Sequence, residues 1–150
     1  MRILVDADAC PKGAREVLFK ISDRLKLEVC LVANIFIKAP ISPLITNIVV
    51  GEGFNVADDK LVEICEEGDL VITADIPLAD RVVKKSAIAF SPRGEVFDEN
   101  TIGSRLAVRD FMEELRETGI QTGGPSSYGS KEKGEFANAL DRFLTKRLKK

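Results

Sequence analysis

Short, uninterrupted apolar segments alternate with helical patterns through much of this 150-residue chain, and two of them run directly into aspartates. Ile3-Leu4-Val5 leads into Asp6, and Leu70-Val71-Ile72-Thr73 leads into Ala74-Asp75. Continuous apolar runs of this length are typical of parallel strands buried on both faces. The alternation of strand and helix therefore predicts an α/β domain with a mostly parallel central sheet flanked by helices.

Turn-forming and capping residues divide the chain into elements. Strands are expected at residues 2–6, 29–33, 47–50, 69–73 and 87–90, with the last of these closing the sheet. Helices are expected to begin near Pro11 with Cys10 at its cap, at Asp58 or Asp59, at Pro77, near Asn100 and at Ser130. Because the sequence contains no linker and no internal repeat, residues 1–150 are predicted to form one domain.

The chain contains no histidine, which restricts the chemistry open to it. A Ser–His–Asp triad, a Cys–His pair, a histidine phosphocarrier and a histidine-ligated zinc are excluded. Its three cysteines (Cys10, Cys30 and Cys65) are widely spaced and form no C-x-x-C pair, which favours a reducing compartment. Since no signal-peptide core and no membrane-length apolar run is present, a cytoplasmic location is expected.

Aspartates follow the predicted strands. Ligands of open α/β sheets bind beyond the carboxyl ends of the strands, so Asp6, Asp8 and Asp75 are expected to meet at one edge. Asp58 and Asp59 would join them from the start of a neighbouring helix. Taken singly, most of these acids are explained as helix caps, which stabilise a helix by about 1 kcal/mol relative to alanine. Asp6 lies too early in the chain for that role.

Taken together, the acids favour a bound cation. Two bare carboxylates about 4 Å apart repel each other by roughly 4 kcal/mol at an effective dielectric constant of about 20. Oxygen ligands without nitrogen or sulfur favour Mg²⁺ or Mn²⁺ over zinc. The predicted metal ligands are Asp6, Asp8, Asp58, Asp59 and Asp75.

Three motifs, in order along the chain, resemble the YaiI/YqxD family. They are Val5-Asp6-Ala7-Asp8-Ala9-Cys10-Pro11, residues 68–79 with the sequence GDLVITADIPLA, and Gln121-Thr122-Gly123-Gly124-Pro125. The resemblance covers essentially the whole chain. That family is in turn similar to PIN domains, which are metal-dependent ribonucleases with an acidic cluster at the end of a parallel sheet. The resemblance implies a three-layer PIN-like α/β domain that uses Mg²⁺ or Mn²⁺.

The likeness to PIN domains also implies roles for individual residues. The catalytic acids would be Asp6, Asp58 and Asp75, with Asp59 as the alternative to Asp58 and Thr73 as the threonine of a Thr-x-Asp strand. A further PIN acid, usually a glutamate, has no clear counterpart, and Asp8 or Asp80 would take its place. Substrate contacts are expected from Asn34, Thr73, Arg93, Gln121, Thr122, Gly123 and Gly124.

These features predict a metal-dependent ribonuclease that acts on RNA or on a nucleotide. One open alternative is a non-catalytic module with a degenerate acidic site, which would bind RNA or a protein partner. Another is an aspartate-nucleophile phosphohydrolase, because Asp6-x-Asp8 after an apolar strand resembles the opening of haloacid-dehalogenase-type phosphatases. The formal net charge of −2 favours a protein partner or a small nucleotide over a long duplex, and no membrane partner is expected.

Overall fold

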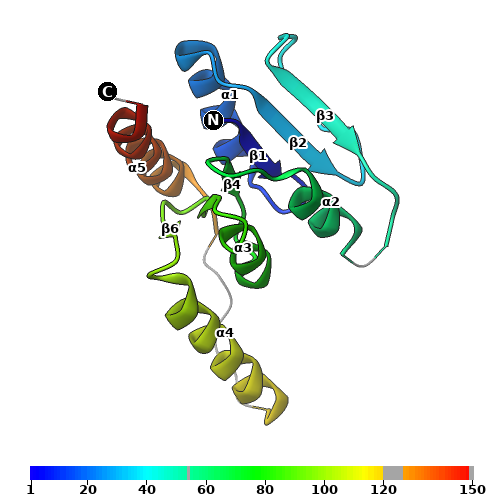
Figure 1. Ribbon diagram of the computed structural model, residues 1–150, viewed down its shortest axis with the longest axis vertical. Coiled ribbons are helices and arrows are strands. Elements are labelled where there is room, and N and C mark those ends of the chain that lie inside the picture. Colours follow the sequence, from blue (N-terminus) through cyan, green and yellow to red (C-terminus); the bar gives the residue numbers. More distant parts are fainter. Residues whose placement is uncertain (54, 120–126, 149–150) are drawn as a thin grey trace.

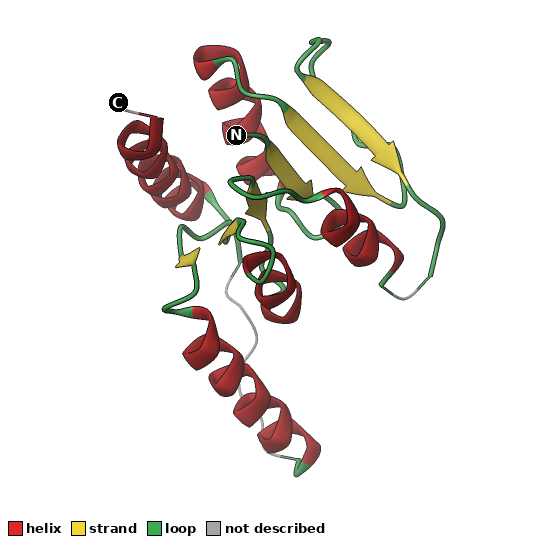
Figure 2. Ribbon diagram, viewed as in Figure 1, coloured by secondary structure: helices red, strands yellow, loops and turns green. Residues whose placement is uncertain are grey.

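The computed structural model describes residues 1–53, 55–119 and 127–148 of the chain. Within these ranges six strands form one sheet in the order β3-β2-β1-β4-β5-β6 (Figure 2). The strands are β1 (Ile3–Asp6), β2 (Val29–Ala33), β3 (Ile45–Val49), β4 (Leu70–Ile72), β5 (Ile88–Phe90) and β6 (Val96–Phe97). Every pairing is parallel except that of β5 with β6, which confirms the predicted α/β class and the mostly parallel sheet.

Helices cover both faces of the sheet, which gives a three-layer arrangement. Those in the described ranges are α1 (Lys12–Leu25), α2 (Val56–Ile64), α3 (Ile76–Val83), α4 (Ile102–Glu117) and α5 (Ser130–Leu148). Because successive side chains of a strand point to opposite faces, Ile3 and Val5 pack with α1 and α5, whereas Leu4 packs with α2 and α3. The expected three-layer fold is therefore confirmed.

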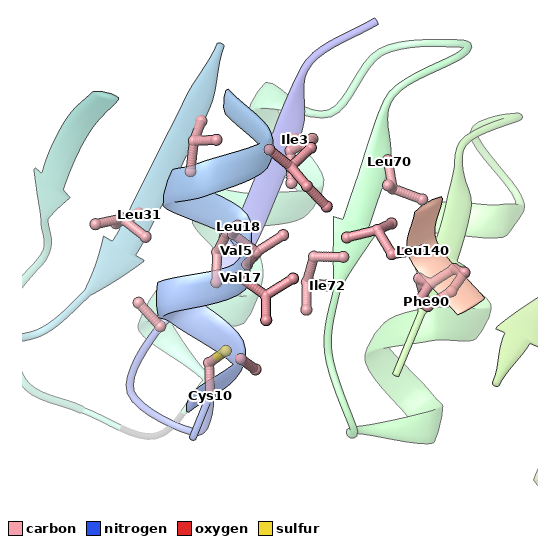
Figure 3. Close-up of a cluster of buried hydrophobic side chains, with 14 of the residues drawn as sticks. Ile3, Val5, Cys10, Val17, Leu18, Leu31, Leu70, Ile72, Phe90 and Leu140 are labelled. Atoms are coloured by element: carbon pink, nitrogen blue, oxygen red, sulfur yellow. The ribbon is translucent and has the colours of Figure 1, made fainter. Parts of the chain in front are cut away.

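The face covered by α1 and α5 shows how the sheet is held. Val17 and Leu18 of α1 lie against Val5 and Ile72 of the central strands (Figure 3). At the edge of this cluster the ring of Phe90 meets that of Phe136 in α5, edge to face, at a centroid separation of 5.9 Å. Both faces of β1 and β4 are buried, so the residues that follow their carboxyl ends extend from the packed core.

The expectation that residues 87–90 form the last strand is wrong. β6 follows a turn at residues 91–94 and pairs antiparallel with β5, so that Ala89 lies opposite Phe97. Gly94 adopts a φ of +92° in this turn, and Ser91 Oγ accepts hydrogen bonds from the backbone N–H groups of Arg93 and Glu95. Two residues are too few to show the alternating pattern by which a strand is recognised in a sequence.

Three other predicted boundaries shift. Helix α2 begins at Val56, not at Asp58 or Asp59, so both aspartates lie in its first turn, where carboxylates suit the helix dipole. Helix α1 has Pro11 at its N-cap in place of the expected Cys10, and no side chain caps it. Strand β3 begins at Ile45, two residues earlier than expected.

Helix α4 reaches away from the rest of the domain (Figure 1) and packs against α3 near its start. Ile102 is its one buried residue, and Val108, Phe111 and Met112 are exposed along its length. Among the residues that the structure describes, no helix is both long and apolar enough to cross a membrane.

Candidate functional site

Asp6 and Asp75 are linked through Thr73 at the carboxyl ends of β1 and β4. The parallel register pairs Val5 with Ile72, which brings Asp6 next to Thr73. Thr73 Oγ1 donates a hydrogen bond to Asp6 Oδ2 (3.0 Å) and accepts one from the Asp75 N–H (3.0 Å). Asp75 Oδ1 in turn accepts a hydrogen bond from the Leu78 N–H (3.1 Å) and so caps α3. The predicted meeting of the two strand ends is therefore present.

Asp6 is a buried carboxyl group with other acids around it. It is 6% exposed. Burial is the main reason why its pKa rises from 3.8 to about 6, and the charges of Asp58, Asp75 and Asp8 raise the pKa further. The hydrogen bond from Thr73 acts in the opposite direction. Four carboxyl groups from three segments of the chain thus share one electrostatic environment at this edge of the sheet.

Asp58 and Asp59 are neighbours in α2 but face different surroundings. The pKa of Asp58 is raised, chiefly by burial and then by the charge of Asp75. Asp59 is exposed and forms an ion pair with Arg81 of α3, with 2.9 Å between its Oδ1 and the Arg81 Nη1. The structure therefore groups Asp58 with the acids of β1 and β4 and engages Asp59 elsewhere. Asp80 is likewise engaged, by Lys84 at 2.8 Å.

Asp8 is held by the start of the β2–β3 connection. The Asn34 N–H donates to Asp8 Oδ2 at 2.9 Å. Turning the Asn34 amide so that its nitrogen faces Asp8 gives contacts of 3.1 Å to both carboxylate oxygens. Asn34, predicted as a substrate contact, thus has Asp8 as its partner, and it fixes this acid at the rim of the site.

The other predicted substrate contacts differ in position. Thr73 is 2% exposed and lies between Asp6 and Asp75, where it orients both. Arg93 is exposed, and its guanidinium carbon lies 5.8 Å from the centre of the Tyr128 ring. Gln121, Thr122, Gly123 and Gly124 fall outside the described residues.

A cleft of about 490 Å³ adjoins the acids on the β5 side. Its wall includes Ala74 and Ile76, on either side of Asp75, together with Arg93, Arg105 and Tyr128. The Tyr128 hydroxyl donates to the Pro92 carbonyl at 2.8 Å, which fixes the ring. Sequence reasoning missed Tyr128, since the only signal it gives is that of a lone tyrosine in a Gly- and Ser-rich stretch.

The acids do not form a closed metal cage. In the described part of the chain, no three Asp, Glu or Cys side chains are placed to hold one ion together. The donor chemistry is nevertheless that of a hard cation, because the charges that raise the pKa of Asp6 are those of the carboxylates Asp58, Asp75 and Asp8. Mg²⁺ usually keeps several waters and takes only one or two protein carboxylates, so such a set fits it without a closed cage.

Comparison with known proteins adds a family. The family model described as "Uncharacterized BCR, YaiI/YqxD family" matches residues 4–146. A UPF0178 protein of Shewanella halifaxensis is 52% identical over 149 residues, covering 99% of both chains. Another, of Pseudoalteromonas atlantica, is 54% identical over 147 residues, covering 98% of this chain and 100% of the relative. A third, of Maridesulfovibrio salexigens, is 51% identical over 148 residues, which are 99% of this chain and 98% of the relative.

No solved structure gave a significant match. The similarity to PIN domains is carried neither by the family model nor by these relatives, and it stays a prediction.

Proposed function

The chain belongs to the YaiI/YqxD family, and from the acids at the carboxyl edge of its sheet we propose that it hydrolyses phosphodiester bonds in RNA with Mg²⁺ or Mn²⁺. The observation that carries the proposal is the environment of Asp6. This buried carboxyl group faces three other carboxyl groups and has no cationic side chain among the causes of its shifted pKa. Such an arrangement destabilises the fold when Asp6 ionises, unless a bound cation offsets the repulsion.

The donors divide into ligands and supports. Asp6, Asp58 and Asp75 are the proposed catalytic acids. One or two of them would ligate the cation directly and the others would bind its waters, and Asp8 is a fourth carboxylate, held at the rim by Asn34. Thr73 orients Asp6 and Asp75 through its hydroxyl group, and the cap of α3 keeps Asp75 at the strand end. When bound, the cation supplies Lewis acidity, which acidifies water and offsets negative charge on the phosphoryl group.

The pKa of Asp6 gives the acids a second task. With a pKa of about 6, Asp6 is mostly ionised near neutral pH and can still take up a proton at a modest cost. Cation binding favours its charged form, so binding is expected to release protons near pH 6.

Support for RNA as the substrate comes from the likeness of the acid layout to PIN ribonucleases and from Arg93 and Arg105 in the adjoining cleft.

The proposal is tested by Mn²⁺ calorimetry and by cleavage of end-labelled single-stranded and structured RNAs. The wild-type protein is compared with Asp6→Asn, which preserves shape, and with Asp23→Asn, which alters an exposed acid of α1 far along the helix from the site. Loss of Mn²⁺ binding and at least a hundredfold loss of cleavage in Asp6→Asn alone would support it. If the wild-type protein neither binds Mn²⁺ nor cleaves RNA, or if all three proteins cleave RNA equally, the proposal is overturned.

A further inference from the structure

A second cleft also adjoins the N-terminus of α1. Pro11 lines the first cleft and Lys12, the next residue, lines the second. The second cleft has a volume of about 620 Å³ and runs between α1 and the β2–β3 connection. This volume is in the range of sites that hold one small organic ligand.

Three cations line this cleft, namely Lys12 and Arg15 of α1 and Lys38 of the β2–β3 connection. Among the described residues, none of the three has a carboxylate within ion-pair distance. The one acid in the wall, Glu16, pairs with Lys133 at 3.1 Å. The cleft is therefore locally positive in a chain whose net charge is −2, which suits an anionic ligand.

Aromatic surface lies in the same cleft. Phe36 is 71% exposed, and Phe19 of α1 is partly buried in the opposite wall. A phenylalanine this exposed gains little from folding. A ring beside cations without a carboxylate partner is the pairing that single-stranded nucleic acids use, with bases stacked on rings and phosphates on cations.

The cleft is connected to the acids through the β2–β3 connection. Asn34, which donates to Asp8, is two residues before Phe36, and two residues of chain span at most about 7 Å. On the other wall, Arg15 Nη1 donates to the Cys10 carbonyl (2.6 Å), in the turn that follows Asp8. A nucleic-acid strand lying in the cleft would thus pass close to Asp8 at the carboxyl edge of β1.

We propose that this cleft binds one nucleotide of a single-stranded nucleic acid, with its base on Phe36 and its phosphates on Lys12, Arg15 and Lys38. The inference rests on the proposed function for its purpose, because it presents the next phosphodiester to Asp6 and Asp8. Binding itself requires neither a cation nor cleavage, so the two proposals fail separately.

The test is fluorescence anisotropy in EDTA with 12-nucleotide RNA and DNA of one sequence and with the corresponding duplex. Both single strands are expected to bind more tightly than the duplex, and tighter binding of RNA would mean that the 2′-hydroxyl is also recognised. Phe36→Ala is expected to weaken binding about tenfold, whereas Phe36→Tyr keeps the ring and the affinity. The matched control is Phe111→Ala, which removes an exposed phenylalanine from α4.

The cations are tested by salt dependence. Lys38→Gln is expected to reduce the slope of log affinity against log salt by about 0.7, the value for one phosphate contact on a single strand, and Lys131→Gln on α5 should leave the slope unchanged. Equal affinities of Phe36→Ala and the wild-type protein would overturn the proposal even if RNA is cleaved. Failure of the wild-type protein to bind any oligonucleotide would also overturn it, as would Phe36-dependent sedimentation with anionic vesicles in its place.

Discussion

Asp6 and Asp69 are two buried aspartates at opposite ends of the neighbouring strands β1 and β4. Asp69 is 4% exposed, and its carboxylate lies 2.7 Å from Arg2 Nη2 and also accepts the Glu66 N–H at 3.0 Å. Asp6 is 6% exposed, and the Thr73 hydroxyl that donates to it is neutral, while the charges that raise its pKa are those of other carboxylates. The two carboxyl groups are equally buried, but the charged groups near them have opposite signs.

The sign of the neighbouring charges distinguishes Asp69, which stabilises the fold, from Asp6, which we assign to function. A buried carboxylate with a cation and two hydrogen bonds ties the start of β4 to the start of β1. A buried carboxyl group among like charges weakens the fold when it ionises, and such groups are common at ligand and catalytic sites. Substitutions at Asp69, Asp6 and Thr73 test the two sides of this contrast.

The largest effect is expected at the structural acid. Asp69→Asn removes the charge that Arg2 pairs with, and breaking a buried pair costs 3–5 kcal/mol. Because the Arg2 side chain is 33% exposed, we expect the free energy of unfolding to fall by about 3 kcal/mol. Urea unfolding at pH 7 measures it, and Asp141→Asn, which breaks the exposed pair with Arg24, should cost less than about 1 kcal/mol. Equal losses in both variants would contradict the contrast.

The opposite sign is expected at Asp6. The unfolded chain ionises near 3.8 and the folded chain near 6, so the folded state holds more protons between these values and loses stability as the pH rises through them. Without a cation, Asp6→Asn should therefore raise the free energy of unfolding by up to about 3 kcal/mol at pH 7 and change it much less at pH 4. Urea unfolding in EDTA at both pH values measures this gain. A loss of stability at pH 7 would make Asp6 a structural acid like Asp69.

This contrast could be predicted from the sequence on one side only. Continuous apolar runs ending at Asp6 and Asp75, together with the rule that ligands meet the carboxyl ends of parallel strands, were sufficient to bring these acids to one edge. The partner of Asp69 was not predictable, since Arg2 is 67 residues away in the sequence. A shift of one residue in the pairing of β1 with β4 would separate the two side chains. The sequence favoured Asp58 with Asp59 as its alternative but could not decide between them, because the phase of α2 relative to the sheet determines which of them faces Asp75.

A divalent cation is expected to reverse the penalty at Asp6. At a concentration ten times its dissociation constant, Mn²⁺ should stabilise the wild-type protein by about 1.4 kcal/mol, because it binds the folded site only. Thermal unfolding with and without MnCl₂ checks this at pH 7. Asp6→Asn should gain nothing, whereas Asp23→Asn should gain as much as the wild-type protein. Stabilisation of all three proteins alike would place the cation elsewhere on the surface.

The smallest effect concerns the hydroxyl group that separates Asp6 from Asp75. Thr73→Val keeps the buried shape but removes the hydrogen bond that lowers the pKa of Asp6, so this pKa should rise above about 6. Thr73→Ser keeps the hydroxyl and should leave the titration of Asp6 unchanged, at a cost of about 0.8 kcal/mol for the lost methyl group. A carboxyl-carbon NMR titration resolves the two variants. If both titrate alike, burial and the neighbouring acids set the pKa of Asp6 alone, and Thr73 acts only on Asp75.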